Sequence, residues 1–389
     1  MQAKENTFRV LPAVLIAAAL LASYSNSWST AFVFDDHASL VHNPLVVNGA
    51  LLQALIEPNA KSHQGATLST RPVASFSFAL NSWISGASPA SFRAGNILIH
   101  WISAWLLWSI FNFSLRRAGS PTQPRDAYLL ATVIALIWAV HPLHTSVVTY
   151  TIQRVEALAG LFYFATWLCF IRAAEALECS KRSGNGWAAA SIACCLLGMA
   201  SKEVMVSAPL IVLLYDRVVI SQSFKAAWQR HGAWHVGLFA CWILLGVVVF
   251  RFSLGNETIG EYVGATWGSY FLSQGYFISR YLFLVVWPAT LVFDYGFTPV
   301  SDLPRLLGGF GLIATLAVLT LLAWRSHFKL ALAGTLFFAL LAPSSSVILI
   351  GTEIAAEHRM YMASMIPIGF VVLAVHRWLA GDHQLFNSA

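Results

Sequence analysis

The sequence predicts an all-α protein that crosses a membrane many times. Hydrophobic residues make up 58% of the 389 residues, and charged residues make up only 10%. Soluble domains have about 25% charged residues, so the composition excludes an ordinary soluble enzyme, a coiled coil and a disordered chain. Long apolar runs recur along the whole chain, as in proteins whose helices span a bilayer. We therefore expect residues 1–389 to form a single integral-membrane domain.

Eleven apolar runs can be distinguished, several of them short for the ~20 residues that a spanning helix needs. The first run follows Lys4 and Arg9 and is typical of either a signal peptide or a retained helix. No clean cleavage site follows it, which favours a retained helix. The runs are about 10–24, 94–114, 127–143, 156–173, 187–200, 203–220, 233–253, 271–292, 305–324, 328–350 and 360–380.

Basic residues indicate the orientation of the chain. Because short cytoplasmic loops are rich in Lys and Arg, three basic loops place the N-terminus in the cytoplasm and loop 25–93 outside. The run 271–292 is ambiguous: if it spans, Arg325 and Lys329 fall outside, and it also contains Arg280 and Pro288. We favour ten spans with an interfacial or re-entrant segment at 271–292, with eleven spans as the alternative. The basic loops contain Arg116, Arg117 and Arg125, then Arg172, Lys181 and Arg182, then Arg217, Lys225 and Arg230.

The remaining composition argues against several other classes of protein. The net charge is +6, but no basic stripe alternates with solvent-facing aromatic residues, so nucleic acid is not an expected partner. The five cysteines show neither a disulfide framework nor zinc-ligand spacing. Residues 72–84 have apolar positions at helical spacing. They predict a short amphipathic helix, lying either on the outer membrane face or against the bundle.

The motif FVFDDHASLVHNP, residues 32–44, directly follows the first helix. Asp35 and Asp36 are adjacent carboxylates held near the membrane by apolar neighbours, and His37 follows them. Repulsion between the carboxylates and burial near lipid both raise a carboxyl pKa, as a general base requires. The pair is also suited to help hold a metal ion. A solvated turn or a helix cap is the alternative for the same residues.

Further polar clusters fall on the same predicted outer side. Arg154 lies near the outer interface, where its guanidinium suits a phosphate, although an arginine reaching to water is the alternative. Lys202 and Glu203 interrupt a hydrophobic hairpin, as either a phosphate site or a turn. Asn96 and His100 share a helix face, where they line a cavity or join helices. The other polar residues of these clusters are His141, His144, Gln153, Glu156, Glu353, Glu357, His358, Arg359 and Tyr361, with Asp294 and Tyr295 expected to be structural.

Together these clusters favour an enzyme at the membrane interface. Cations would bind the phosphate of a lipid-linked donor, and a carboxylate would deprotonate an acceptor hydroxyl. A transporter or flippase of a lipid-linked sugar is the alternative function. Transporters generally carry such charges deeper in their helices, whereas here they lie at helix ends.

At these motifs the chain resembles the GT-C superfamily of integral-membrane glycosyltransferases. The likeness is to the branch of TMTC-type protein O-mannosyltransferases and their bacterial relatives, and it covers about residues 31–365. Each motif is weak alone, but their order and spacing are fairly specific. They are FDDHASLVHNP, STRPVASFSFALNSWISG, NILIH, HPLHTSVVTYTIQRVEALAGLFY, SKEVMVSAPLIVLLYD, WPATLVFDYG and EHRMYMAS.

The resemblance implies a GT-C-like bundle with short amphipathic outer-face helices. It implies inverting transfer of a sugar from a polyprenyl phosphate to an acceptor hydroxyl, with Asp35 as base and Asp36 beside it. It suggests phosphate binding by Arg71, Arg154, Lys202 and Arg359. We expect the substrates to be lined by His37, Asn96, His100, His141, His144, Gln153, Glu156, Glu203, Glu357 and Tyr361.

The resemblance leaves the cofactor and the acceptor less defined. No cofactor is assigned with certainty, and a divalent cation on Asp35 and Asp36 is an expectation only, because metal dependence varies within the superfamily. The eukaryotic members carry tetratricopeptide repeats after the membrane domain, whereas this chain stops soon after its last helix. We therefore expect a small enzyme of the bacterial inner membrane that faces the periplasm. Its expected acceptor is a protein Ser or Thr, for example in a pilin, with a glycan as the alternative.

Overall fold

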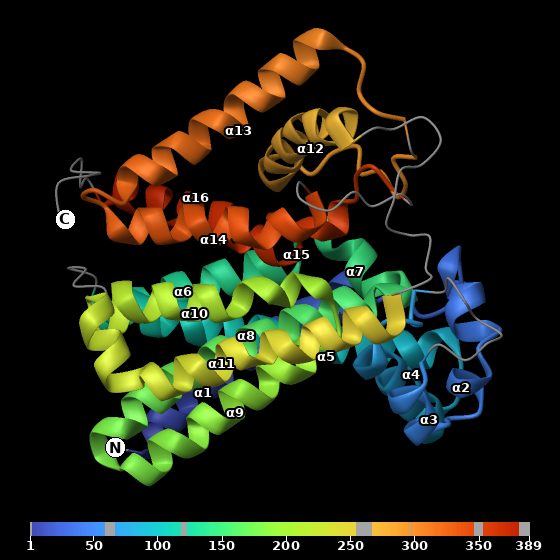
Figure 1. Ribbon diagram of the computed structural model, residues 1–389, viewed down its shortest axis with the longest axis horizontal. Coiled ribbons are helices and arrows are strands. Elements are labelled where there is room, and N and C mark those ends of the chain that lie inside the picture. Colours follow the sequence, from blue (N-terminus) through green and yellow to red (C-terminus); the bar gives the residue numbers. More distant parts are fainter. Residues whose placement is uncertain are drawn as a thin grey trace.

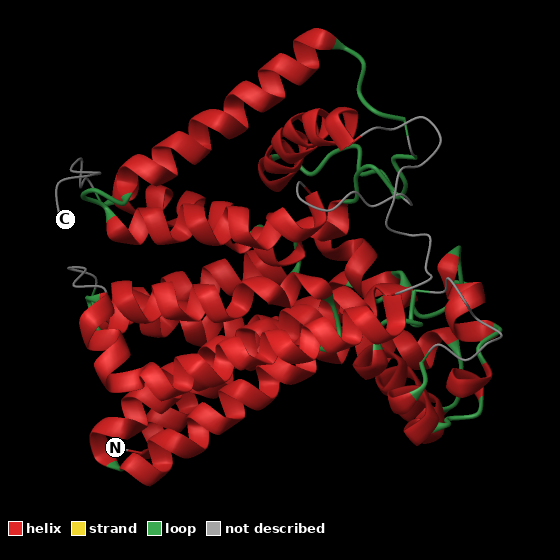
Figure 2. Cartoon of the chain, viewed as in Figure 1, coloured by secondary structure: helices red, strands yellow, loops and turns green. Residues whose placement is uncertain are grey.

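The computed structural model describes residues 2–58, 67–117, 123–253, 267–296, 298–345 and 353–380. This part of the chain contains helices and loops but no strand, so the predicted all-α class is confirmed (Figure 2). The α-helices are α1 (Gln2–Ser23), α2 (Pro44–Val47), α3 (Leu51–Ile56), α4 (Pro72–Ser85), α5 (Pro89–Arg117), α6 (Pro124–Ala139), α7 (Thr145–Thr149), α8 (Arg154–Cys179), α9 (Lys181–Met199), α10 (Ala208–Tyr215), α11 (Phe224–Ser253), α12 (Trp267–Val286), α13 (Leu303–Ala323), α14 (Phe328–Ser345), α15 (Met360–Ala363) and α16 (Met365–Leu379).

Shorter helical turns connect several of these helices. The 3₁₀ turns are η3 (Pro142–His144), η4 (Thr151–Gln153), η5 (Glu203–Ser207) and η7 (Glu357–Arg359). The π-helical turns are η1 (His37–Val41) and η6 (Asp216–Ile220). Figure 1 shows α2, α3 and α4 together at one end of the bundle, away from both chain termini. The acidic motif lies at this end, which we call the acidic end.

Five of the described helices are long and apolar enough to cross a membrane, and seven if each of two bent pairs forms one span. The protein is therefore a multi-pass membrane protein. The predicted runs 10–24, 187–200 and 203–220 coincide with α1, α9 and the η5–α10–η6 segment, which do not meet the same length and hydropathy test. The number of ten or eleven spans stays a prediction.

The position of α12 bears on the ambiguous run 271–292. Near its start, the hydroxyl of Tyr270 donates to the carbonyl of Ser344, at 3.2 Å. Near its end, the carbonyl of Val285 lies 2.9 Å from Nε2 of His141. Both partners lie toward the acidic end, and whether this segment spans the membrane stays a prediction.

The turn after α13 lies beside another basic segment. The guanidinium of Arg217 lies over the rings of Trp324 and Phe328, 5.1 and 4.5 Å from their centroids. The turn that holds Arg325 is therefore beside a loop that was predicted to be cytoplasmic.

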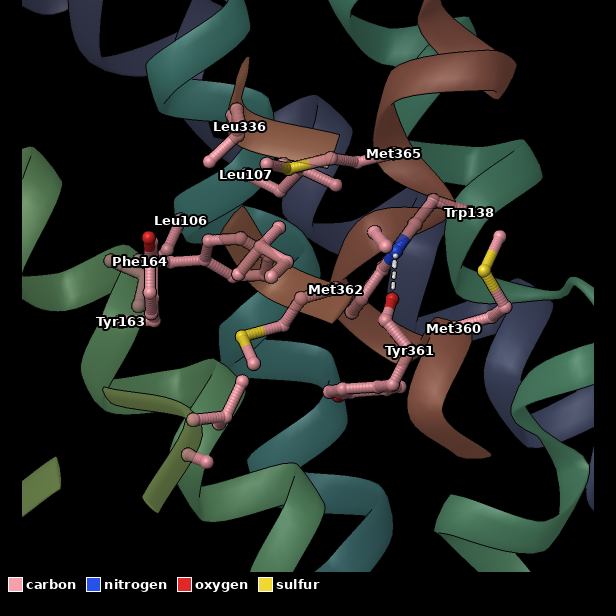
Figure 3. Packing of buried hydrophobic residues seen from close by; sticks show 14 of the residues in the cluster. Leu106, Leu107, Trp138, Tyr163, Phe164, Leu336, Met360, Tyr361, Met362 and Met365 are labelled. Atoms are coloured by element: carbon pink, nitrogen blue, oxygen red, sulfur yellow. Dashed lines mark hydrogen bonds between the residues drawn. The ribbon is translucent and has the colours of Figure 1, made fainter. Parts of the chain in front are cut away.

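Aromatic, leucine and methionine side chains fill the interior between α5, α6, α8 and α15. Trp138 and Tyr361 are both fully buried. The indole Nε1 of Trp138 donates to the carbonyl of Tyr361 at 2.9 Å, which joins α6 to α15 (Figure 3). Met360, Met362 and Met365 pack around this contact, where flexible thioether chains fill irregular gaps. The core thereby fixes the approach of residues 353–363 to the acidic end.

A buried polar cluster lies away from the acidic end. Oδ2 of Asp216 accepts hydrogen bonds from Nδ1 of His231 and Nε2 of His235, at 2.9 and 2.8 Å. The hydroxyl of Ser221 donates to Oδ1 of the same carboxyl group at 2.8 Å. The cluster joins η6 to α11.

Candidate functional site

The two carboxylates of the acidic motif lie in different environments. Asp35 is exposed, and the hydroxyl of Thr67 donates to its Oδ2 at 3.3 Å. Asp36 has no exposed surface, and its carboxylate accepts backbone N–H bonds from Val33 and Ile152 at 3.2 and 2.8 Å. Burial raises the pKa of the Asp36 carboxyl, while these N–H groups and nearby Arg93 act to lower the pKa. Only Asp35 has a carboxylate that an external molecule can reach.

The backbone of the acidic motif is strained beside these carboxylates. Phe34 has a φ of +45°, which is unusual for a bulky residue. Its ring packs on Phe293, whose ring also contacts Tyr150, with centroid distances of 5.1 and 5.0 Å. The Asp35 N–H donates to the Tyr150 hydroxyl at 3.1 Å. The surrounding contacts thus hold the turn in a conformation that presents the Asp35 side chain.

Arg93 fixes the chain just before the acidic motif. It lies near the start of α5 with 2% of its surface exposed. Its guanidinium donates to the carbonyls of Thr30, of Ala31 at 2.8 Å, and of Thr149 at 3.1 Å. Arg93 therefore ties the segment before the acidic motif to the segment that contains Thr149.

A continuous series of contacts links Asp35 to two cations. Thr67, which donates to Asp35, also accepts a hydrogen bond at its carbonyl from Nη1 of Arg71, at 3.1 Å. Arg71 pairs with Glu203 at 3.6 Å. Nε of Arg71 is buried and has no hydrogen-bond partner among the described residues. The Arg71 side chain as a whole is 19% exposed, so part of its guanidinium remains accessible.

Lys202 precedes Glu203 and pairs with Glu156 of α8. The side chain of Lys202 is 13% exposed and that of Glu156 is 3% exposed. The carbonyl of Ala200 accepts from the N–H of Val73 at 3.2 Å, which brings this turn to the start of α4. Lys202 and Arg71 thus lie on neighbouring segments at the acidic end.

The turn before α15 brings a third carboxylate to this end. Nε2 of His358 lies 3.7 Å from Oε1 of Glu353, whose side chain is 32% exposed. Burial raises the pKa of the Glu353 carboxyl, while Arg359 and Lys202 lower the pKa. Asp35 also acts electrostatically on Glu353 and raises its pKa further. Arg359 itself is buried and donates to the carbonyls of Glu353 and Ile354 at 3.0 and 3.3 Å.

Arg154 lies inside the protein and makes four hydrogen bonds there. Its guanidinium donates to Oδ1 of Asn96 and of Asn81, and to the carbonyls of Ser77 and Phe92. The donor–acceptor distances of these bonds are 2.6–3.2 Å. It also stacks on the ring of Phe78, 4.1 Å from the centroid. Asn96 in turn donates to the carbonyls of Val148 and Thr151, so Arg154 joins α8 to α4 and α5, and Asn96 joins α5 to α7 and η4. No bound phosphate is needed to explain either side chain.

Several other predicted residues lie in the core instead of beside Asp35. Nε2 of His100 lies 2.8 Å from the carbonyl of Ala139 and must donate to it, so Nδ1 accepts from the Tyr361 hydroxyl at 2.7 Å. His144 is bound between the carbonyl of Trp138 and the hydroxyl of Ser364, at 2.7 and 2.9 Å. The side chains of His100, His144 and Tyr361 have no exposed surface.

The remaining predicted residues divide between anchoring and exposure. His141 binds the carbonyl of Val285, and Oε1 of Glu357 accepts from the Val292 N–H and the Tyr295 hydroxyl, both at 2.9 Å. His37 is exposed next to Asp36, and Oε1 of Gln153 is buried without a partner among the described residues. In the described ranges, no group of three or more His, Cys, Asp or Glu side chains could hold a metal ion.

Three contributors were missed in the sequence. Arg93 shares a helix face with Asn96 and His100, and this spacing in an apolar run was the available signal. Thr67 and Tyr150 carry no signal of their own, because their role depends on contacts across the fold.

The fold and the site define a multi-pass helical membrane protein with an exposed carboxylate and two cations gathered at one end. Sequence comparison agrees with this class: the chain is distantly homologous to the TMTC protein O-mannosyltransferases. It is 31% identical to Protein O-mannosyl-transferase TMTC1 of Mus musculus over 169 residues, which are 42% of this chain and 17% of that protein. It is 29% identical to TMTC2 of Homo sapiens over 228 residues, which are 56% of this chain and 26% of that protein.

A third relative is Tmtc3 of Drosophila melanogaster, 27% identical over 234 residues, which are 55% of this chain and 25% of that protein. In these three comparisons the chain thus spans about a quarter or less of its relatives' length. No protein-family model matches the chain, and no solved structure matches it.

Proposed function

We propose that this protein is a membrane glycosyltransferase that moves a sugar from a polyprenyl phosphate to a protein Ser or Thr hydroxyl. The observation that carries the proposal is the contact series from exposed Asp35 through Thr67 to Arg71. It puts a base and a cation within reach of one substrate. The homologous TMTC proteins, named as protein O-mannosyl-transferases, support sugar transfer to a protein.

The reaction is a direct displacement at the anomeric carbon. The acceptor oxygen forms a bond to that carbon while the bond from the carbon to the phosphate oxygen breaks. Asp35 takes the acceptor proton, and the polyprenyl phosphate leaves with the bonding electrons. Attack opposite the leaving group inverts the anomeric configuration.

Arg71 and Lys202 bind the phosphate in this proposal. Charge builds up on the phosphate as the sugar leaves, and cations placed beforehand stabilise that charge. The side chains of Arg71 and Lys202 are 19% and 13% exposed, so part of each remains accessible to a phosphate. Arg154 and Arg359 instead hold the surrounding segments together. We place the reaction at the periplasmic face of a bacterial inner membrane, since the basic turns lie away from Asp35.

The test is a transfer assay on the purified full chain in lipid nanodiscs. Polyprenyl-phosphate sugars and a cell-envelope extract are supplied, and released lipid phosphate and labelled protein are measured. We expect release and labelling by the wild type and a loss of at least about 100-fold for Asp35→Asn. Asp302→Asn is the matched control, because Asp302 is an exposed carboxylate that pairs only with Arg305 in the described structure.

Two results would overturn the proposal. Equal release by wild type and Asp35→Asn would remove Asp35 as the base. Movement of the intact lipid-linked sugar across the membrane of reconstituted vesicles, with no bond broken, would support a transporter instead. Labelling of glycan but not protein would change the acceptor and leave the reaction in place.

A further inference from the structure

We propose that Arg93 and Asp36 are positioning residues that together hold Asp35 in its reactive place. The inference rests on the proposed function and assigns the two adjacent carboxylates different tasks. Asp35 meets the substrate, whereas Asp36 is turned inward and binds backbone. We call Arg93, Asp36 and the backbone groups that they bind the clamp.

The clamp holds the acidic motif at two points. Before the motif, Arg93 binds the carbonyls of Thr30 and Ala31. Within it, Asp36 binds the N–H of Val33. Only a short stretch around Phe34 and Asp35 remains between these points. A stretch fixed on both sides has little freedom, which is what a base placed to within a fraction of an ångström requires.

Both members of the clamp attach the motif to the same receiving segment. Arg93 binds the carbonyl of Thr149, and Asp36 binds the N–H of Ile152. Between these two positions, Tyr150 accepts the N–H of Asp35 itself. Residues 149–152 thus bind residues 30–36 at three positions. The clamp is also complementary in charge, because the buried cation of Arg93 acts electrostatically on the buried carboxylate of Asp36.

The strain at Phe34 shows that the turn needs such support. A left-handed backbone costs a bulky residue free energy and persists only where its surroundings enforce it. Without the clamp, Phe34 can relax toward an ordinary φ, and the relaxation turns the next residue, Asp35, away from Thr67. Loss of the clamp should therefore move Asp35 while the helices stay packed.

The first test measures the position of residue 35 without any need for turnover. Asp35→Cys and Thr67→Cys are combined in the full chain, because their side chains meet in the structure. An oxidant such as copper phenanthroline removes two electrons and two protons and leaves a disulfide. Mass spectrometry counts the 35–67 linked peptide, which separates it from products of the native cysteines. We expect Arg93→Met and Asp36→Asn to lower its yield at least about fivefold.

Asp216→Asn is the matched control for this test. Asp216 is as buried as Asp36 and binds several donors, but it lies away from the acidic end. We expect this variant to keep the yield of the linked peptide. Equal yield in the clamp variants and the wild type would overturn the proposal, as would an equal fall in Asp216→Asn.

The second test separates positioning from a general loss of structure. Turnover and donor binding are measured on the folded fraction, with undecaprenyl-phosphate mannose as the probe. We expect Arg93→Met to lower kcat about 10–100-fold with the donor Kd changed less than about twofold, because a displacement near 1 Å costs about that much. Arg93→Lys, which keeps the cation, should recover part of kcat. A parallel loss of binding and turnover would reduce Arg93 to an ordinary structural residue.

The two proposals fail in different ways. If Asp35→Asn keeps full turnover, the proposed base is wrong, even if linkage shows that the clamp positions residue 35. If Asp35→Asn is inactive while the clamp variants keep linkage and kcat, the base stands and the clamp is wrong.

Discussion

Lys202 and Glu156, 46 residues apart in the chain, form an ion pair that is almost withdrawn from solvent. The pair connects the turn before η5 to the first turn of α8. Glu156 is the more enclosed partner, with a side chain 3% exposed. A buried carboxylate without a partner is costly, so Lys202 has a structural task in addition to the proposed phosphate contact.

Replacing Lys202 should therefore reduce both stability and turnover. We expect Lys202→Met to lower the free energy of unfolding by about 3–5 kcal/mol, because Glu156 is left as an unpaired charge. Denaturant unfolding in mixed micelles measures this change. The double variant Lys202→Met/Glu156→Leu should recover most of the stability but not the turnover. Recovery of turnover in the double variant would show that Lys202 does not contact the donor.

The clamp predicts a dependence of turnover on pH. The clamp needs the Asp36 carboxylate, and burial raises the pKa of that carboxyl above its ordinary value of 3.8. As pH falls through this raised pKa, Asp36 gains a proton and loses an acceptor, so kcat should decline at a higher pH than an ordinary Asp would give. The charge of Arg93 lowers the same pKa. Arg93→Met should therefore move the acid limb of kcat to higher pH.

A profile of kcat against pH for wild type, Arg93→Met and Arg93→Lys measures this shift. The lysine variant keeps the charge and should lie near the wild type. The other groups that face Asp36 are backbone N–H groups of Val33 and Ile152 and the side chain of Thr151, none of which titrates in this range. Superimposed profiles for all three proteins would contradict the prediction.

Gly160 tests the tight packing of α8 against α15. A Cβ at this position would lie 2.6 Å from Cε1 of Tyr361, whose side chain is fully buried and hydrogen-bonded. We expect Gly160→Ala to destabilise the protein by about 1–3 kcal/mol, as overpacked cores do. Gly186→Ala in α9 is the control, since nothing lies within 4 Å of the new Cβ. Thermal unfolding should show a lower midpoint for the first variant and an unchanged or higher one for the second.

The cluster around Asp216 should contribute stability without affecting the chemistry. In Asp216→Asn the amide nitrogen cannot accept a hydrogen bond, so at least one of the donors from Ser221, His231 and His235 loses its partner. We expect a loss of about 1–3 kcal/mol in the free energy of unfolding. Turnover per folded molecule should equal that of the wild type. Reduced turnover at unchanged stability would connect this cluster to the site, against the geometry.

The sequence was most informative where a physical constraint acts along the chain. Apolar runs gave the helical class, and a proline before apolar residues at helical spacing gave the helix at Pro72–Ser85. Phe78 of that helix is fully buried against the bundle, while Trp83 and Ile84 are 69% and 68% exposed, and a position on the membrane face stays a prediction.

The roles of individual polar residues depended on contacts that no local pattern contains. Arg154 and Asp35 both looked like exposed site residues. However, the donors of Arg154 bind acceptors in α4 and α5, and of the two residues only Asp35 is accessible. Adjacent carboxylates in the sequence gave no means of telling which one faces inward. Arg93 was missed because its partners are backbone carbonyls, which every residue has.

Helix α13 touches little of the rest of the protein. Only 11% of its most apolar window is buried, compared with 72% for the span that contains α8. In a bilayer the exposed surface of α13 would face acyl chains, and detergent replaces these when the membrane is dissolved. The detergent or lipid chosen for purification should therefore affect the structure. Short-chain detergents should loosen the packing of α12 and α13 first, while the tightly packed helices around α8 stay in place.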